Sequence, residues 1–431
     1  MRVSLFAQLI VVAFALVVNA RGLAEIVQLP RFALQEHATA IVVGKCLKVE
    51  STVERDGDVE RTEWAHRLQV ESAERDGQSA IKVGDEIVVL SWTAKWVGAG
   101  DPPPFGTGHR GMPELGERRR VFIGGSIAQA AQERRDKKLD ALRLTAMLPN
   151  GWQPVERNVV LVGADDEYRS EVSMPLVADC LAHDATVKTV VAFPADPATK
   201  QLDLERRDHI ERLAALGDAD AAVLFMRWRE LDAANWSIFR DYLLSGQPLV
   251  GLRTSTHMLR SSAKDPNADL DVELPTRLFG THWISHAGNA TGTRVLPPEG
   301  DAARHPILRG IRGGFVVPSW LYDVEPLSPD CKVLLWGEVV SKDGSTPATH
   351  RQPILWIREA NASTPLPLPG AGRPARRMAF TTLGHPGDFA NVEVRRLVEQ
   401  MTLWAMGDEA SIPAEGVKAE PSAPYAAPST R

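Results

Sequence analysis

Four apolar runs between residues 158 and 252 constrain the fold of this chain more than any other feature of its sequence. They occupy 158–163, 187–193, 220–225 and 248–252, and the stretches 170–182, 205–216 and 235–245 between them predict amphipathic helices. Strands without a polar face, alternating with helices, indicate a parallel sheet covered on both faces. The sequence therefore predicts an α/β domain with a doubly wound parallel sheet over 153–408.

Polar segments follow the ends of the predicted strands. They are 165–169, 227–230, 253–257 and, after a further apolar run, 381–388. Parallel sheets bind ligands beyond the carboxyl ends of their strands, and this mixture of acids, arginines, hydroxyls, Trp and His suits a polyol or a small anionic ligand. The alternative is that these loops are polar because they meet water. The candidate ligand-binding residues are Asp166, Arg169, Arg227, Arg253, Thr254, His257 and His286.

Five motifs in this region occur in an order that resembles the ThuA-like (trehalose-utilisation) family. They are residues 159–171, 248–257, 304–311, 382–386 and 397–407. The family belongs to the class I glutamine amidotransferase-like superfamily. The resemblance implies a flavodoxin-like sheet and a loose association with sugar metabolism.

The resemblance also places the superfamily's catalytic positions on this chain. Its nucleophilic Cys follows the strand that here ends at Leu252, but the next residue is Arg253, which has no nucleophilic atom. Its His corresponds to His385, while the acid that should follow Pro386 is replaced by Gly387, with Asp388 one place later. A His without a nucleophile cannot run acyl transfer, so glutaminase activity is not expected.

His385 and Asp388 remain the candidate catalytic residues. The imidazole of His385 has three possible roles: general base, partner of a sugar hydroxyl, or structural histidine capped by Asp388. The sequence leaves these three open.

The N-terminal part of the sequence shows a different pattern. Short β-rich runs separated by Gly-containing turns predict a small antiparallel barrel over 30–125, and their order resembles the OB-like barrel of netrin and tissue-inhibitor-of-metalloproteinase modules. An Ala- and charge-rich stretch predicts a helical linker over 126–152. Residues 409–431 are rich in Pro, Ala and Ser, which predicts a disordered tail.

The first 20 residues predict export. An apolar run from Val3 to Val18 ends in small residues that suit signal-peptide cleavage after Ala20. The run is short for a membrane span, which needs about 20 apolar residues. A periplasmic or extracellular protein is expected, and an uncleaved anchor is the alternative.

Several classes of partner and cofactor are not expected. A formal net charge of −6 argues against nucleic acid, and three distant cysteines form no metal knuckle. The GxGxxG match at 106–111 has no strand before it and no helix after it, so no dinucleotide is expected. His282 and His286 have metal-pair spacing without a third ligand. No metal, cofactor or membrane partner is therefore predicted beyond the signal segment, and nothing specifies the oligomeric state.

Two functions are compatible with these observations. In the first, the α/β domain binds or processes a carbohydrate-related small molecule at its strand ends. The chain has 11 Trp and only 4 Tyr, and tryptophans serve either as buried core residues or as stacking platforms for sugars. In the second, the protein is a non-catalytic scaffold with a degenerate amidotransferase-like domain and a barrel that binds a partner.

Overall fold

The computed structural model describes residues 16–18, 24–26, 28–29, 31–75, 80–100, 107–184, 186–260, 269–345, 350–359 and 377–430. The chain divides into two compact units, Met1–Val155 and Glu156–Arg431, a few residues after the predicted end of the linker. Residues 1–15 and 19–20 of the predicted signal segment lie outside the described residues, and within it Leu16–Val18 (β1) pairs with Ala24–Ile26 (β2). In the described ranges no helix is both long and apolar enough to cross a membrane.

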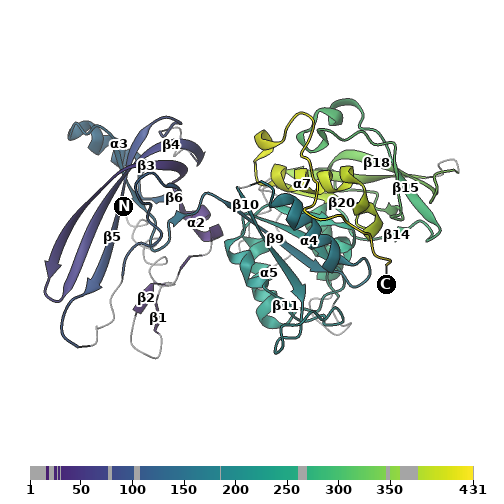
Figure 1. Ribbon diagram of the computed structural model, residues 1–431, viewed down its shortest axis with the longest axis horizontal. Helices are drawn as coiled ribbons and strands as arrows, with labels where there is room; N and C mark the ends of the chain where they lie inside the picture. Colours follow the sequence, from purple (N-terminus) through teal and green to yellow (C-terminus); the bar gives the residue numbers. More distant parts are fainter. Residues whose placement is uncertain are drawn as a thin grey trace. The chain divides into compact units, whose positions relative to one another are not determined.

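Five strands of unit 1 close into a barrel (Figure 1). Their order is β3-β4-β5-β7-β6, and β6 pairs back onto β3. The pair β5–β7 is parallel and the other pairs are antiparallel. A short helix, α2 (Arg31–His37), precedes the barrel, and β8 (Trp152–Gln153) adds to β6. The barrel strands are β3 (Ala40–Asp56), β4 (Val59–Arg75), β5 (Glu86–Trp96), β6 (Arg118–Gly124) and β7 (Leu142–Ala146).

The barrel is longer than the sequence predicted, because the expected linker is part of it. Residues 126–152 begin with a helix, α3 (Ile127–Asp136), but then form β7 between β5 and β6. Leu142, Leu144 and Ala146 alternate with exposed residues and join the barrel core. This five-residue strand completes the barrel, so the linker prediction does not hold after residue 141.

Unit 2 is built on a ten-stranded sheet with order β11-β10-β9-β12-β13-β20-β19-β18-β15-β16. The five strands β10, β9, β12, β13 and β20 are parallel, as predicted, and in chain order they run 2-1-3-4-5. The bounds are β9 (Arg157–Ala164), β10 (Val187–Pro194), β11 (Ile210–Glu211), β12 (Ala221–Met226), β13 (Leu249–Leu252), β15 (Thr291–Val295), β16 (Val316–Val317), β18 (Lys332–Ser341), β19 (Arg351–Glu359) and β20 (Arg377–Thr381).

The other half of the sheet differs from the predicted all-parallel arrangement. Strands β18 and β19 pair with each other antiparallel, as a hairpin whose loop is too short for a helical crossover, and β15 and β16 continue the antiparallel edge. On the opposite edge, β11 is also antiparallel to β10. The sheet is therefore mixed, with the parallel strands at one side.

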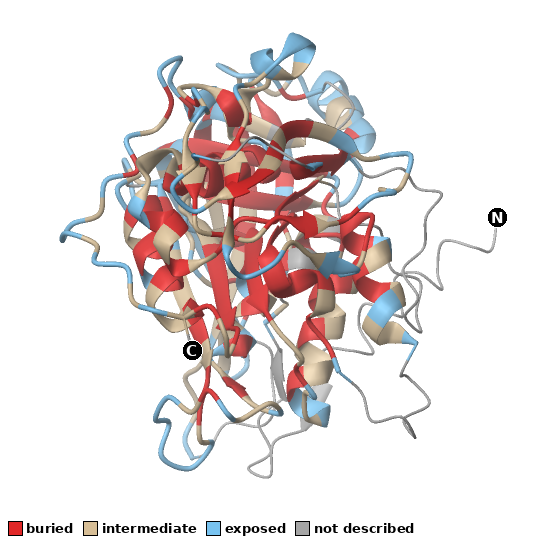
Figure 2. Ribbon diagram, turned by 90° about the vertical axis from the view of Figure 1, so that its right-hand side faces the viewer, coloured by how far each residue is buried: buried red, intermediate tan, exposed pale blue. Residues whose placement is uncertain are grey.

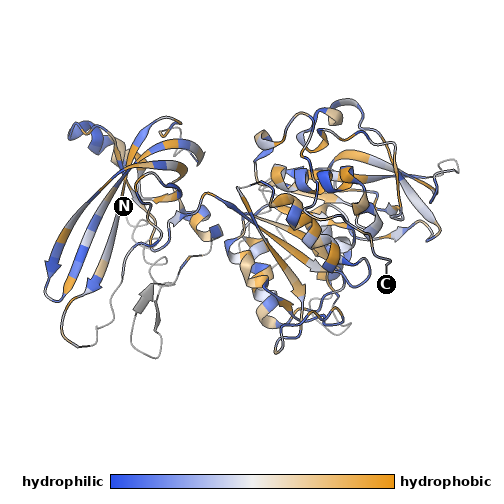
Figure 3. Cartoon of the chain, in the orientation of Figure 1, coloured by the Kyte–Doolittle hydropathy of each residue, from blue (hydrophilic) through white to orange (hydrophobic). Residues whose placement is uncertain are grey.

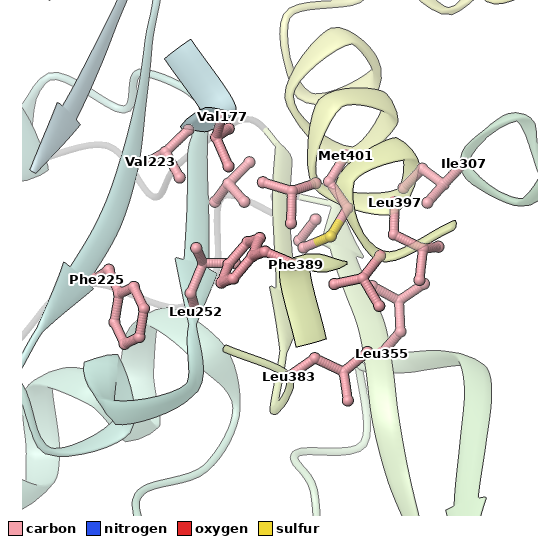
Figure 4. Close-up of a cluster of buried hydrophobic side chains, with 14 of the residues drawn as sticks. Val177, Val223, Phe225, Leu252, Ile307, Leu355, Leu383, Phe389, Leu397 and Met401 are labelled. Carbon is pink, nitrogen blue, oxygen red and sulfur yellow. The ribbon is translucent and has the colours of Figure 1, made fainter. Parts of the chain in front are cut away.

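Alternate residues of the central strands face two separate cores. In β12, Val223 and Phe225 face one core, and Ala222, Leu224 and Met226 face the other. The first core is covered by α4 (Ser170–Leu181) and α7 (Val392–Ala405), whose side chains meet the sheet in Figure 4. The second is covered by α5 (Ala233–Leu244) and α6 (Leu270–Phe279). Buried residues accordingly fill the strands and the inward faces of the helices (Figure 2).

The hydropathy of the strands reflects this difference in burial. In Figure 3 the central strands of unit 2 are mostly hydrophobic, whereas the long strands of unit 1 carry many hydrophilic residues. The end of β3 from Glu50 onward is almost wholly exposed. Two-sided burial in unit 2 explains why its strands are the more readily recognised in the sequence.

The predicted helix over 205–216 is absent. The segment instead contains β11 and a 3-10 helix, η1 (Leu213–Asp218). Its buried residues Ile210, Leu213 and Leu216 are three apart, a spacing that suits the tighter turn of a 3-10 helix as well as one face of an α-helix. The hydrophobic pattern was real, but the helix type was wrong.

The predicted disordered tail is held against unit 2 over residues 409–430. Ile412 and Ala419 are buried. Arginine side chains of the domain donate to backbone carbonyls of the tail: Arg309 to Ile412 at 2.5 Å, Arg395 to Ala419 at 2.8 Å and Arg396 to Val417 at 2.6 Å. The prediction of disorder is wrong here because it was based on side-chain composition, whereas these arginines bind the backbone carbonyls of the tail.

Candidate functional site

Direct contacts join the four polar segments that follow the parallel strands. Asp166, after β9, pairs with Arg227, after β12, at 2.8 Å between Oδ1 and Nη1. The carboxylate of Asp165 accepts from the Thr254 hydroxyl, after β13, at 2.7 Å. Arg253 donates to the carbonyl of Thr382, after β20, at 3.0 Å. The strand ends therefore form one continuous cluster at the carboxyl edge of the sheet.

Arg253 lies at the centre of this cluster and is fully buried. Its Nη1 donates to Ser319 Oγ and to the carbonyls of Trp320 and Thr382, and its Nη2 donates to the Tyr168 hydroxyl. The guanidinium also lies 4.3 Å from the Tyr168 ring centroid and 4.5 Å from that of Tyr322. Burial opposes its charge, yet Tyr322, Tyr168 and Asp388 raise its pKa. Arg253 is thus a structural cation, which corrects its assignment as a ligand-binding residue.

Asp388 is the counter-charge of Arg253 and is equally buried. Its carboxylate accepts from the Ser319 amide and hydroxyl, and from the amides of Gly384 and His385. Burial raises its pKa, while the hydrogen bond from Ser319 and the charge of Arg253 lower it. All these partners lie away from the imidazole of His385. Asp388 therefore completes the capping box of η5 (Pro386–Ala390), whose N-cap is His385, and is not the catalytic partner that we expected.

His385 is half-buried beside Tyr168, with ring centroids 6.2 Å apart. Its Nδ1 accepts from the amide of Gly387 at 3.0 Å. Burial, with the charges of Arg253 and Lys342, lowers its pKa to about 4, so the ring is neutral at pH 7. Because Nδ1 is the acceptor, the proton is assigned to Nε2. Nε2 is then a hydrogen-bond donor and not the general base that was one of our hypotheses.

Thr254 is also inaccessible, because it is fully buried and donates to Asp165. Asp165 accepts two backbone amides as well, from Glu167 and Tyr168. Burial raises the pKa of Asp165 to about 6. This carboxylate ties the loop after β9 to the loop after β13, so Thr254 supports the site from behind and does not line it.

A second group of charges surrounds Asp166, whose side chain is 10% exposed. Besides Arg227, it has Arg229 at 3.4 Å and Arg207 at 3.5 Å. Arg229 is buried, and burial lowers its pKa despite the nearby carboxylates of Asp166 and Asp165. Arg227 and Asp166 are therefore brought together as predicted, with two further arginines.

Aromatic rings form a continuous band along the same edge, which we call the aromatic belt. Neighbouring ring centroids are 5.1–6.3 Å apart. Trp283 is 37% exposed and five other rings are half-buried, so the belt borders solvent. In order of contact the belt consists of Trp228, His257, Trp283, His286, Trp320, Tyr168 and His385.

Two predicted residues, His257 and His286, are belt members. His257 lies between Trp228 and Trp283, and its pKa is lowered to about 3 by burial, Arg227 and Arg253. His286 belongs to β14 (Ser285–His286), where it faces Tyr322 of β17 (Tyr322–Asp323). This small two-stranded sheet brings His286 and Trp320 within 5.1 Å.

Arg169 is the predicted residue that points elsewhere. It donates to Glu171 at 2.7 Å and to the Ser429 carbonyl at 3.4 Å. His282 is likewise outside the belt: its Nδ1 is 3.2 Å from the Thr276 hydroxyl, and the residue lines a separate cavity of about 530 Å³ with Glu273 and Arg358. In the part of the chain that the structure describes, no three His, Cys, Asp or Glu side chains gather as metal ligands.

Sequence reasoning missed the contribution of residues 319–322. Ser319 and Trp320 lie between β16 and β17, and Tyr322 begins β17, so all three are distant along the chain from the parallel strands. The only signal was the high Trp content of the chain. Trp320 completes the belt, and Ser319 bridges Arg253 and Asp388.

Comparison with known proteins gives few matches. No protein-family model and no curated protein matches the chain. Among solved structures, the chain is similar to a protein described as ThuA-like from Bacteroides uniformis ATCC 8492, with 14% identity and a TM-score of 0.38, over 58% of this chain and 91% of that chain.

Two further solved structures show a similar degree of likeness. A protein described as ThuA-like from Parabacteroides merdae ATCC 43184 has 14% identity and a TM-score of 0.35, over 59% of this chain and 90% of that chain. The mmIFT52 N-terminal domain has 11% identity and a TM-score of 0.30, over 57% of this chain and 96% of that chain. The first two carry the name of the family that the motifs of this chain resemble. At these TM-scores, the fold described above rests on its own strand order and contacts.

Proposed function

We propose that unit 2 is a ThuA-like, flavodoxin-like domain that binds a carbohydrate-related small molecule along the aromatic belt. The observation that carries this proposal is the belt itself, a row of neighbouring aromatic rings at the strand ends, most of them partly exposed. Ligand sites combine such aromatic surfaces with a few polar groups that fix orientation. Here those groups are the Nε2–H of His385, the imidazole of His257 and the nearby arginines.

The proposed activity is binding without acyl transfer. The position of the superfamily's nucleophile is filled by Arg253, which is buried and committed to four hydrogen bonds. His385, with its proton on Nε2, is suited to donate to a hydroxyl or carbonyl oxygen of the ligand. A binding protein therefore accounts for these residues better than a hydrolase does.

Two further proposals concern the barrel and the N-terminal segment. A closed five-stranded barrel supports the OB-like assignment of unit 1, and binding of a partner there is the second candidate function. Export through residues 1–20 stays a prediction, and the N-terminal residue of the mature protein would test it.

Saccharide titration of the full chain tests the proposed function. Neutral mono- and disaccharides, trehalose included, are titrated by calorimetry and by tryptophan fluorescence. We expect at least one to bind, and expect Trp283→Ala and Trp320→Ala each to weaken it about tenfold, or ~1.4 kcal/mol. Trp336→Ala is the matched control, because Trp336 lies on β18 outside the belt. Equal affinities in all three variants would contradict the proposal.

A further inference from the structure

Positive charge accumulates at the Trp228 end of the aromatic belt. The guanidinium carbon of Arg227 lies 3.5 Å from the Trp228 ring centroid and that of Arg260 lies 5.2 Å from it. Arg207 and Arg229 are held nearby through Asp166. Among the described residues, the carboxylates that contact these arginines are Asp166 and Glu167, with Asp165 already bonded to Thr254. Four guanidinium groups therefore exceed the carboxylates even when all three acids are ionised.

The cations at this end are also short of hydrogen bonds. Within the described residues, Arg227 Nε, Arg229 Nη2 and His257 Nδ1 are buried atoms that make none. Arg227 Nε is 3.0 Å from Glu167, and Arg229 Nη2 is 3.4 Å from Asp166, but neither has hydrogen-bond geometry. A buried polar group without a hydrogen bond is unfavourable. His257 Nδ1 has no hydrogen bond among the described residues, and the two arginine atoms have only ion-pair contacts, so this end can accept a further hydrogen-bonding group.

The backbone beside these atoms is strained. Trp228 has φ +47°, in the left-handed region that non-glycine residues rarely adopt. This conformation lets the ring meet Arg227 on one side of the chain and His257 on the other. Strain of this kind persists where the surroundings enforce it, often at ligand sites.

We infer that the ligand of the belt is an acidic saccharide whose oxyanion binds at the Trp228 end. This inference rests on the proposed function, because the belt supplies the sugar contacts. Guanidinium groups form paired hydrogen bonds with carboxylate and phosphate oxygens, and the half-exposed Arg207 and exposed Arg260 are accessible to such a group. The shared chemistry is an oxyanion on a sugar, either a uronate carboxylate or a phosphate ester.

A matched set of sugars distinguishes a carboxylate ligand from a phosphate ester. The full chain is titrated with a methyl hexoside, with its 6-carboxylate and with its 6-phosphate, at low and at high salt. We expect the better charged sugar to bind at least about tenfold more tightly than the neutral one, and the advantage to shrink as salt screens the charges. Which charged sugar binds best identifies the oxyanion.

Substitution of Arg260 tests whether the oxyanion binds at the Trp228 end. Arg260→Gln changes an exposed side chain, so folding should be preserved, and it should reduce the ratio of charged to neutral affinity about threefold to tenfold. Arg304→Gln is the control, because Arg304 is exposed and, among the described residues, its ion pair is with Asp301 in η3 (Gly300–Arg304). A ratio near one in the wild type, or a ratio unchanged by Arg260→Gln, would overturn the inference.

The two proposals fail in distinguishable ways. Equal binding of neutral and charged sugars overturns the acidic ligand and keeps the proposed function. Binding of inorganic phosphate that depends on Arg260, without binding of any sugar, overturns both the carbohydrate function and the acidic saccharide, and shows an anion site of another kind. No binding of either sugars or phosphate overturns both.

Discussion

The two ends of the aromatic belt hold buried charge in different ways. At the Arg253 end, one guanidinium and one carboxylate share Ser319. Arg253 also donates to two carbonyls and Asp388 also accepts from Gly384, which leaves the Arg253 Nε as the one buried atom of this pair without a hydrogen bond among the described residues. At the Trp228 end, four guanidinium groups crowd around fewer carboxylates, and three buried atoms lack a hydrogen bond within the described ranges.

This difference separates structural charge from charge kept for a ligand. A buried ion that is paired and hydrogen-bonded has no hydrogen-bonding capacity left for a ligand. A buried ion that lacks hydrogen bonds can still bind an added polar group. Arg253, at the nucleophile's position, is closer to the first kind, because it makes four hydrogen bonds and only its Nε lacks one within the described residues. Arg227, which the sequence also named, and Arg229, which it did not name singly, are closer to the second.

The largest expected effect is at the paired end. Arg253→Met should lower the free energy of unfolding by about 3–5 kcal/mol, because it leaves Asp388 buried without its counter-charge. Urea unfolding of the full chain, followed by tryptophan fluorescence, measures this. Arg260→Gln is the control from the other end and should change stability by less than about 0.5 kcal/mol. Similar effects of the two variants would break the distinction between the ends.

An intermediate effect is expected from His257, which lies next to Trp228 in the belt. Its pKa is about 3 in the folded protein and near 6.5 when unfolded, so the unfolded chain binds the extra proton between these values. Stability from this group is therefore complete above pH 6.5 and is lost as pH falls, by at most about 1.4 kcal/mol per pH unit. Asp165, whose pKa is raised to about 6, acts in the opposite direction.

A variant isolates the histidine from that opposing carboxylate. The stability of wild type minus that of His257→Gln should decline as the pH is lowered from 7 to 5. His183→Gln, at the exposed end of α4, should leave the wild-type profile unchanged. A wild-type minus His257→Gln difference that stays flat with pH would mean that His257 is not held neutral by burial and the arginines.

The smallest effect concerns the tail beside the paired end. The Tyr425 hydroxyl donates to the Pro386 carbonyl at 2.9 Å, next to His385. Tyr425→Phe should cost about 1 kcal/mol and reduce the hydrogen-exchange protection of the Val417 amide, which donates to Gln400. Unchanged protection would show that the tail is held without this contact.

The sequence predicted those parts of the fold in which burial leaves a pattern. Strands β9, β12 and β13 are largely buried on both faces, β10 is apolar apart from Lys188 and Thr189, and all four were found within one or two residues. The hairpin of β18 and β19 and the short strand β7 were missed. Their place in a sheet depends on partners that are distant in the chain, which local periodicity does not report.

The site was predicted by location more than by role. Asp166, Arg227, His257, His286 and His385 all lie in the cluster at the strand ends. The roles of Arg253, Thr254 and Asp388 were wrong because a sequence does not show which polar side chains are buried and satisfied by one another. Trp320 could not be assigned at all, since it reaches the belt from an irregular segment.

The hydrogen bonds that bind the C-terminal segment affect how the sequence of that segment can vary. Arg309, Arg395 and Arg396 donate hydrogen bonds to its carbonyl oxygens, and every residue type has the same backbone carbonyl. Side chains of this segment that make no contact with the domain can consequently vary as long as the path of the backbone is kept, whereas Gly416, Ala419 and Ser422 are held by close packing, burial and a hydrogen bond to Asp179. Substitutions of the three arginines should therefore displace the segment more than substitutions at its exposed positions.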